Sequence, residues 1–116
     1  MATASKNVNL REVVWIWFPN ADEQDYSRRP ALVLAKLSGD DIILAQMTTF
    51  LERDEYSITV HPGDIVGKSF RNDSSIRPNK LFTACKTMLL DEKVGILKPA
   101  IFQQVLQKLK QIFNIT

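Results

Sequence analysis

The chain has 116 residues, of which 45% are hydrophobic and 24% are charged, and its formal net charge is +2. This length and composition are typical of one globular domain, and they exclude a disordered chain and a protein with long apolar membrane spans. A net charge this small also excludes a uniformly basic surface for nucleic acid, so any nucleic acid would be held by a few local arginines and lysines.

Cysteine content and the N-terminal segment indicate the compartment. Cys85 is the single cysteine, so an intrachain disulfide is impossible and a reducing environment is expected. Residues 1–9 lack the apolar run of a signal peptide, and we expect them to form a flexible tail before one domain that spans 10–116. We therefore expect a cytoplasmic protein that does not contact a membrane.

The first half of the chain predicts three antiparallel strands. Large apolar residues on both faces indicate a strand over 12–18. A polar loop of about ten residues then leads to a second apolar strand over 30–36. The turn Ser38-Gly39-Asp40-Asp41 joins it to a third strand over 42–47, and so short a connection requires antiparallel pairing. These strands form a meander, which excludes a doubly wound fold.

The second half predicts a weaker strand, an extended segment and a clear helix. Residues 56–60 alternate between apolar and polar and indicate a half-exposed strand, whereas 63–74 are expected to be loop. Residues 75–83 are expected to be extended, with Pro78 confined to a sheet edge or a bulge. A helix is predicted to begin at Pro99. Its apolar stripe is Ile101, Val105, Leu109 and Ile112, widened by Phe102, Leu106 and Phe113.

About five short antiparallel strands with one terminal helix predict a small barrel of the α+β class. A barrel has one interior, so strands that are apolar on both faces need a cover on their outer side. The helix or a second copy of the chain could supply that cover. A homodimer is the simplest solution, because isologous contacts are the commonest in oligomers.

The sequence gives little support for chemistry based on a metal or an imidazole. His61 is the single histidine, and it is far from Cys85 in the chain and lacks ligand spacing. We expect His61 to be a surface residue at a strand end and Cys85 to be a small buried thiol. The chain also lacks a glycine-rich phosphate loop and a Gly-x-Ser-x-Gly motif. We therefore expect neither a metal nor a cofactor.

Polar residues gather at the predicted strand ends and in the adjoining loops, where side chains from distant segments converge. They are Glu23, Arg29, Thr48, Thr49, Arg77 and Asn79. Each also has an ordinary explanation: Arg29 could pair with a loop carboxylate, Thr48 could be a strand-end hydroxyl, and Arg77 a solvated charge. Together, these arginine, hydroxyl and amide groups suit a substrate that supplies its own nucleophile.

RNA is such a substrate, because its 2′-hydroxyl can attack the adjacent phosphorus once a base takes its proton. A guanidinium would stabilise the negative charge on phosphorus through forked hydrogen bonds to the phosphate oxygens. A carboxylate such as Glu23 could serve as the base. The residues permit this chemistry without requiring it.

Several segments resemble the MazF/PemK (Kid) toxins of bacterial toxin–antitoxin pairs, in conserved order from about residue 10 to the C-terminus. They are Val14-Trp15-Ile16-Trp17-Phe18-Pro19, Asp22-Glu23-Gln24, Arg29-Pro30-Ala31-Leu32-Val33-Leu34, Ala45-Gln46-Met47-Thr48-Thr49, Ser75-Ile76-Arg77-Pro78-Asn79-Lys80 and the Gly95-Ile96-Leu97 turn before the final helix. The resemblance implies an SH3-like barrel shared with the CcdB group, a homodimer and metal-independent cleavage of single-stranded RNA (mRNA). It also implies a cognate antitoxin that wraps the dimer and blocks the RNA groove.

The resemblance implies roles for individual residues. Arg29, directly before Pro30, matches the family's catalytic arginine, Thr48 matches its catalytic threonine, and Glu23 matches a loop glutamate near the site. One branch of the family uses an Arg-x-Asp pair for acid–base chemistry. Arg77 matches that arginine, but Asn79 replaces the aspartate, and an amide cannot carry a proton. The residues expected to line the RNA path are Arg28, Thr49, Phe50, Arg77, Asn79 and Lys80.

Two alternatives stay open at this point. The chain could be a toxin that cleaves RNA, or it could use the same barrel to bind another protein, as a CcdB-like poison of DNA gyrase or a catalytically inactive family member would. Asn79 and the first loop, which contains no glycine, favour the second alternative. Phe50 or Tyr26 could stack on a base. For Phe50, we favour packing on the barrel rim.

Overall fold

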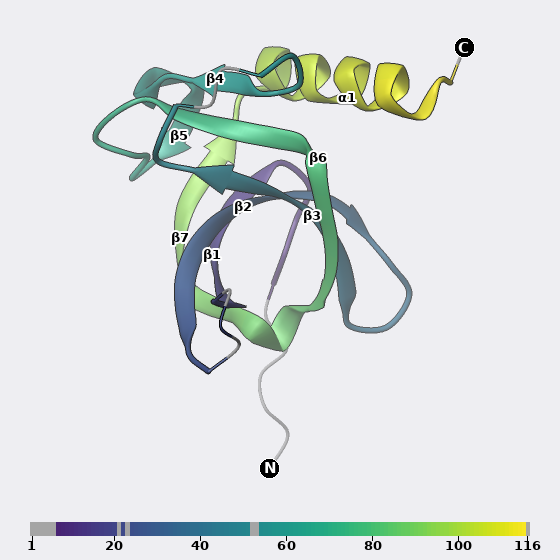
Figure 1. The fold of residues 1–116 in the computed structure, drawn as a ribbon. Coiled ribbons are helices and arrows are strands. Elements are labelled where there is room, and N and C mark those ends of the chain that lie inside the picture. Colours follow the sequence, from purple (N-terminus) through teal and green to yellow (C-terminus); the bar gives the residue numbers. More distant parts are fainter. Residues whose placement is uncertain (1–6, 21, 23, 52–53, 116) are drawn as a thin grey trace.

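In the part of the chain that the structure describes, one seven-stranded antiparallel sheet closes almost completely into a barrel, and one helix lies across its upper end in Figure 1. The computed structural model describes residues 7–20, 22, 24–51 and 54–115. The strands are β1 Glu12–Pro19, β2 Tyr26–Lys36, β3 Asp41–Thr48, β4 Ile58–Val60, β5 Ile65–Gly67, β6 Ser74–Cys85 and β7 Leu89–Leu97. Short 3-10 turns at Pro62–Asp64 and Lys86–Met88 precede β5 and β7, and helix α1 spans Pro99–Phe113.

The strand order confirms the predicted barrel class. Within the sheet the order is β4-β6-β3-β2-β1-β7-β5. The first three strands form the predicted antiparallel meander, in which Leu32 of β2 pairs with Val13 of β1 and with Ala45 of β3. β1 also pairs with β7, so the first strand of the chain lies beside the last one.

Two strands lie where the sequence did not predict them. β5 occupies part of the 63–74 segment that we expected to be loop, and β7 contains Gly95, which we expected to lie in a turn. The φ angle of Gly95 is 153°, and a Cβ placed there would lie 2.3 Å from the carbonyl oxygen of Val66. Glycine at this position lets β5 and β7 approach closely. From one sequence, a glycine with this role cannot be distinguished from a glycine in a turn.

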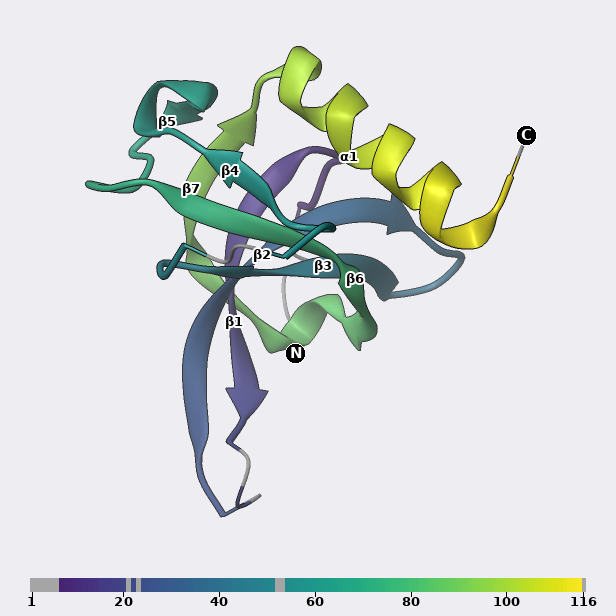
Figure 2. The same ribbon diagram turned by 45° about the horizontal axis from the view of Figure 1, so that its top comes forward.

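β6 bends sharply beneath α1 (Figures 1 and 2). Its pairing with β3 shifts register between Ala45 and Gln46, so residues 78–80 bulge out of the ladder. Pro78 lies in this bulge, as the sequence predicted, because proline cannot donate a ladder hydrogen bond. The bulge presents Asn79 and Lys80 to solvent.

The core consists of two apolar clusters on opposite faces of the sheet. The first lies beneath α1 and includes Val13 of β1 together with Phe102 and Val105 of the helix. The second includes Val14 and Ile16, so β1 supplies alternate residues to both clusters, as predicted.

Helix α1 begins at Pro99, as predicted, and most of its apolar stripe packs on the first cluster. Phe113 was expected to widen this stripe, but it is exposed because it lies in the last turn of the helix. Among the described residues, no helix is long and apolar enough to cross a membrane.

The segment before β1 packs against the barrel. Val8 is 2% exposed and belongs to the second apolar cluster. The buried Glu12 carboxylate accepts the N–H of Asn9 at 2.7 Å and pairs with the Lys93 ammonium group at 2.8 Å. Residues 1–6 lie outside the described part of the chain. For residues 7–9, the expectation of a flexible tail is wrong, because these contacts hold them to β1 and β7.

Cys85 ends β6 as a free thiol that is only partly buried, which corrects the expectation of a buried one. The Thr87 hydroxyl donates a hydrogen bond to its sulfur at 3.2 Å. The thiol lies at a strand end, where the barrel leaves one side open to solvent, and not in either apolar cluster.

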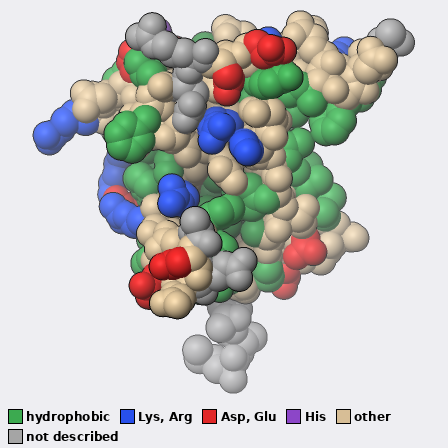
Figure 3. Space-filling model, viewed as in Figure 1, with side chains coloured by type: hydrophobic (Ala, Val, Ile, Leu, Met, Phe, Trp, Pro, Cys, Tyr) green, Lys and Arg blue, Asp and Glu red, His purple; other side chains and the backbone are tan. Residues whose placement is uncertain are grey.

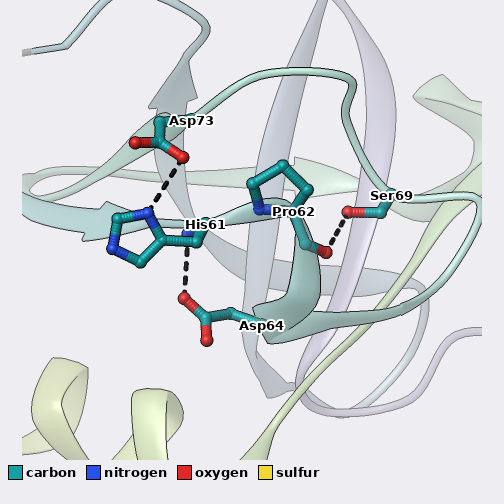
Figure 4. Close-up of polar contacts among 5 residues, drawn as sticks. All are labelled: His61, Pro62, Asp64, Ser69 and Asp73. Carbon is teal, nitrogen blue, oxygen red and sulfur yellow. Dashed lines mark hydrogen bonds and ion pairs between the residues drawn. The ribbon is translucent and has the colours of Figure 1, made fainter.

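His61 is the exposed strand-end residue that the sequence predicted, and Figure 4 shows its contacts. Its ring Nδ1 lies 2.9 Å from Oδ1 of Asp73, and its backbone N–H donates to the Asp64 carboxylate at 2.8 Å. The hydrogen bond to Asp73, and then the charge of that carboxylate, raise the pKa of His61. These contacts tie the end of β4 to the segment that precedes β6.

We expect the pKa of His61, measured by NMR titration, to lie above 6.5 and to fall toward that value in Asp73→Asn. The pKa of His61 is higher in the folded protein than in the unfolded chain. The contact with Asp73 therefore stabilises the folded protein fully at pH values below the unfolded pKa. This stabilisation is lost as the pH rises through the folded pKa. Asp25→Asn, in the β1–β2 loop, is the control. An unchanged His61 titration in Asp73→Asn would contradict the assignment.

Candidate functional site

The β1–β2 hairpin extends beyond the barrel and carries two arginines (Figure 2). β2 begins at Tyr26 and not at the predicted residue 30, so Arg28 and Arg29 lie inside the strand. The connecting loop is only 20–25. The polar residues before Pro30 suggest a loop, but these residues form part of β2 because they pair with the apolar strand β1.

The two arginines lie on opposite faces of the hairpin, because side chains alternate along a strand. The guanidinium carbon of Arg28 lies 4.7 Å from the centroid of the Trp15 ring, a cation–π contact on the face of the first apolar cluster. Arg29 pairs with Ile16 of the second cluster and is exposed. Of these two arginines, Arg29 is therefore the one that shares a sheet face with the second cluster.

One face of the sheet places Arg29, Thr48 and Arg77 on three adjacent strands. Gln46 of β3 pairs with Ala31 of β2 on one side and with Arg77 of β6 on the other. Thr48 is two residues after Gln46, and Arg29 is two residues before Ala31, so these side chains share the face of Gln46. We call Arg29, Gln46, Thr48 and Arg77 the polar face. The sequence predicted that three of its members would converge, but it missed Gln46.

Thr48 ends β3, as predicted, and its hydroxyl group has a defined orientation. The Thr48 Oγ1 atom accepts the N–H of Phe50 at 3.1 Å. The hydroxyl proton can therefore be donated to a ligand. Thr49 and Phe50 follow in an exposed turn. Phe50 is 79% exposed, so the expectation that it packs on the barrel rim is wrong.

Arg77 is half-buried, and within the described part of the chain its Nε atom is buried without a hydrogen-bond partner. The pKa of the nearby Asp54 carboxyl is lowered, chiefly by the backbone N–H of Ser57 and to a smaller extent by the Arg77 charge. Asn79 and Lys80 lie on the bulge directly after Arg77. Glu23, the predicted base, lies outside the described residues.

Basic side chains on the face seen in Figure 3 are separated by hydrophobic and neutral ones. This distribution agrees with the small net charge and with local contacts to an anion in place of a continuous basic surface. Over the described residues, no group of three or more His, Cys, Asp or Glu side chains is arranged to hold a metal ion.

The fold is similar to that of several solved toxins. An endoribonuclease in complex with its cognate antitoxin, from a mycobacterial species, has a TM-score of 0.71 and 16% identity, over 94% of this chain and 98% of that one. A chain of the MazE–MazF crystal structure (form II) from Deinococcus radiodurans has a TM-score of 0.73 and 14% identity, over 94% of this chain and 97% of that one. The Mycobacterium tuberculosis toxin MazF-mt6 has a TM-score of 0.72 and 14% identity, over 91% and 99%.

These structures share only 14–16% of their residues with the chain and show its fold alone, whereas a family model matches its sequence. The comparison with curated proteins gave no match. The model of the PemK-like, MazF-like toxins matches residues 10–113, which cover almost the whole barrel and the helix. The chain therefore belongs to the PemK-like, MazF-like toxin family of type II toxin–antitoxin systems.

Proposed function

We propose that this toxin is an endoribonuclease that cleaves single-stranded RNA (mRNA) by attack of the RNA's own 2′-hydroxyl. The observation that carries the proposal is the polar face, where Arg29, Thr48 and Arg77 lie on adjacent strands. Membership of the toxin family supports it, and two of the similar structures are endoribonucleases. The family match also favours this function over the binding of DNA gyrase.

In the proposed reaction, the exposed Arg29 guanidinium binds a non-bridging phosphate oxygen and stabilises the charge that develops as the 2′-oxygen attacks phosphorus. The Thr48 hydroxyl donates a second hydrogen bond to the phosphate. The bond from phosphorus to the 5′-oxygen breaks as the bond to the 2′-oxygen forms. The 2′-hydroxyl proton passes to a base, for which Glu23 is the candidate, and the departing 5′-oxygen takes up a proton from water. The base then returns its proton to the solvent.

Residues on the bulge and in the neighbouring turn are proposed to bind the RNA and to take no part in proton transfer. Arg77 supplies a second cation, whereas the amide of Asn79 can only form hydrogen bonds. Catalysis therefore depends on Arg29 and Thr48. Additional contacts with the RNA are assigned to Arg28, Thr49, Phe50 and Lys80.

We propose that the toxin acts in the cytoplasm as a homodimer that a cognate antitoxin inhibits. An apolar groove of about 360 Å³ lies between β1 and the end of β6, lined in part by Trp17, Tyr26, Phe82 and Met88. Trp17 is 46% and Tyr26 58% exposed. Exposed aromatic side chains around a groove are typical of protein interfaces. We assign this groove to the second copy of the chain.

The proposal is tested by incubating the toxin with mixed-sequence single-stranded RNA in excess EDTA and mapping the product ends. We expect a 2′,3′-cyclic phosphate (or the 3′-phosphate formed from it) and a free 5′-hydroxyl. An RNA with a 2′-deoxy nucleotide at the mapped site is the matched control, and it should stay intact because it lacks the nucleophile. Cleavage of that control would contradict the mechanism, and DNA cleavage seen only with gyrase would support the protein-binding alternative.

A further inference from the structure

We propose that a groove beneath the C-terminal half of α1 binds one base of the RNA, adjacent to the cleaved phosphate. This inference rests on the proposed RNA cleavage. The groove has a volume of about 460 Å³, which suits a small-ligand site. Its lining residues are Glu55, Tyr56, Asn79, Lys108, Gln111 and Ile112.

The groove is formed by three segments that are distant in the sequence. Glu55 and Tyr56 come from the segment before β4, Asn79 from the bulge of β6, and Lys108, Gln111 and Ile112 from the last two turns of α1. Asn79 belongs to the bulge and therefore links the groove to Arg77, two residues earlier on the same strand. The Arg77 charge also acts on the Asp54 carboxyl, which directly precedes Glu55 of the lining, so Arg77 lies near this side of the groove as well.

Hydrogen bonds hold the loop side of the groove in place before any ligand binds. The Asp54 carboxylate accepts the backbone N–H groups of Tyr56 at 2.9 Å and of Ser57 at 2.7 Å. The Lys108 ammonium group donates to the carbonyl oxygen of Glu55 at 3.0 Å, which ties the loop to the helix. A ligand therefore meets residues 54–57 already held in place by hydrogen bonds, and preorganisation of this kind favours binding.

The lining combines the groups that recognise an unpaired base. The half-buried Tyr56 ring offers a surface on which a base can stack, and Ile112 adds an apolar contact. The exposed amides of Asn79 and Gln111 can each donate and accept hydrogen bonds, as the edges of bases require. An apolar peptide would leave these amides without partners, so a base fits the lining better.

Replacing Gln111 with alanine tests the inference, because it removes one amide and keeps a strong helix former. Cleavage of a random RNA pool is sequenced for the wild type, Gln111→Ala, Asn79→Ala and the control Gln103→Ala. Gln103 is exposed on the same helix and does not line the groove. We expect the base preference at one position beside the cleaved bond to fall about tenfold in Gln111→Ala and Asn79→Ala. Gln103→Ala should keep the preference of the wild type.

The outcomes separate this inference from the proposed function. If the wild type cleaves RNA and Gln111→Ala keeps its full base preference, the groove does not read a base and the inference is wrong. If the folded wild type cleaves no RNA, the proposed function is wrong and the inference fails with it. A loss of preference in Gln103→Ala as well would overturn the assignment to the groove, because the effect would then come from the helix in general.

Discussion

We expect Arg29→Ala to lower kcat/KM for RNA cleavage by roughly 10²- to 10³-fold, the loss typical when one donor to the developing charge is removed. The Arg29 side chain is exposed and lies two residues before Ala31, where β2 begins to pair with β3, so its loss should leave the stability of the barrel unchanged. The kcat/KM of Arg29→Lys should lie between those of the wild type and Arg29→Ala, because lysine keeps the charge but cannot form a forked pair of hydrogen bonds. Initial rates with a single RNA oligonucleotide measure the effect.

Lys36→Ala is the control for this prediction, because it removes a positive charge from the exposed far end of the same strand. We expect it to cleave RNA like the wild type. Thr48→Ala should also lower the rate, and Thr48→Ser should restore much of it, since serine keeps the hydroxyl that the Phe50 N–H orients. If Arg29→Ala kept the activity of the wild type, the prediction would be wrong, and Arg77 would be the candidate for the residue that stabilises the phosphate charge.

Gly95→Ala is expected to lower the free energy of unfolding by about 2 to 3 kcal/mol, near the upper end for overpacking. An added Cβ would lie 2.3 Å from the Val66 carbonyl oxygen and 2.7 Å from Cγ2 of Ile65. The oxygen belongs to the backbone of β5, so it cannot turn aside as the end of a side chain could. Gly95 also pairs with Val13 of β1, and a shift to relieve the clash would disturb three strands.

Gly63→Ala is the matched control for Gly95→Ala. A Cβ on Gly63 has no atom within 4 Å, and its backbone does not adopt a positive φ. We expect its unfolding midpoint in urea to stay close to that of the wild type, with both variants measured at one protein concentration because association would shift the midpoint. Equal midpoints for the two variants would show that β5 moves freely and that the close approach is unimportant.

The parts of the fold that the sequence predicted are those with a strong local pattern. β1 and β3 are rich in apolar residues and lie between segments with clear turn residues. The apolar stripe of α1 follows Pro99, a residue typical of a helix start. β7 was missed because its charged centre and Gly95 resemble a loop, and only its pairing with β1 makes it a strand. Such long-range pairing outweighs local preference and cannot be read from one sequence.

The site was predicted in part for the same reason. Arg29, Thr48 and Arg77 stood out as polar residues beside apolar strands, and the register places them on one face. The sequence gave no signal for Gln46, which looks like any polar residue in a half-exposed strand. Lys108 and Gln111 resemble the solvent-exposed side of a helix, and their place in the groove depends on how α1 packs over β6.

The pairing of β1 with β7 has a consequence for synthesis on the ribosome. β1 emerges first, but its partner strand ends at Leu97, and Lys93 of that strand also holds Glu12 and the segment before it. An unfinished chain therefore cannot close its sheet and keeps one edge of β1 exposed until β7 has been made. Prematurely terminated chains would lack this closure and be open to proteases.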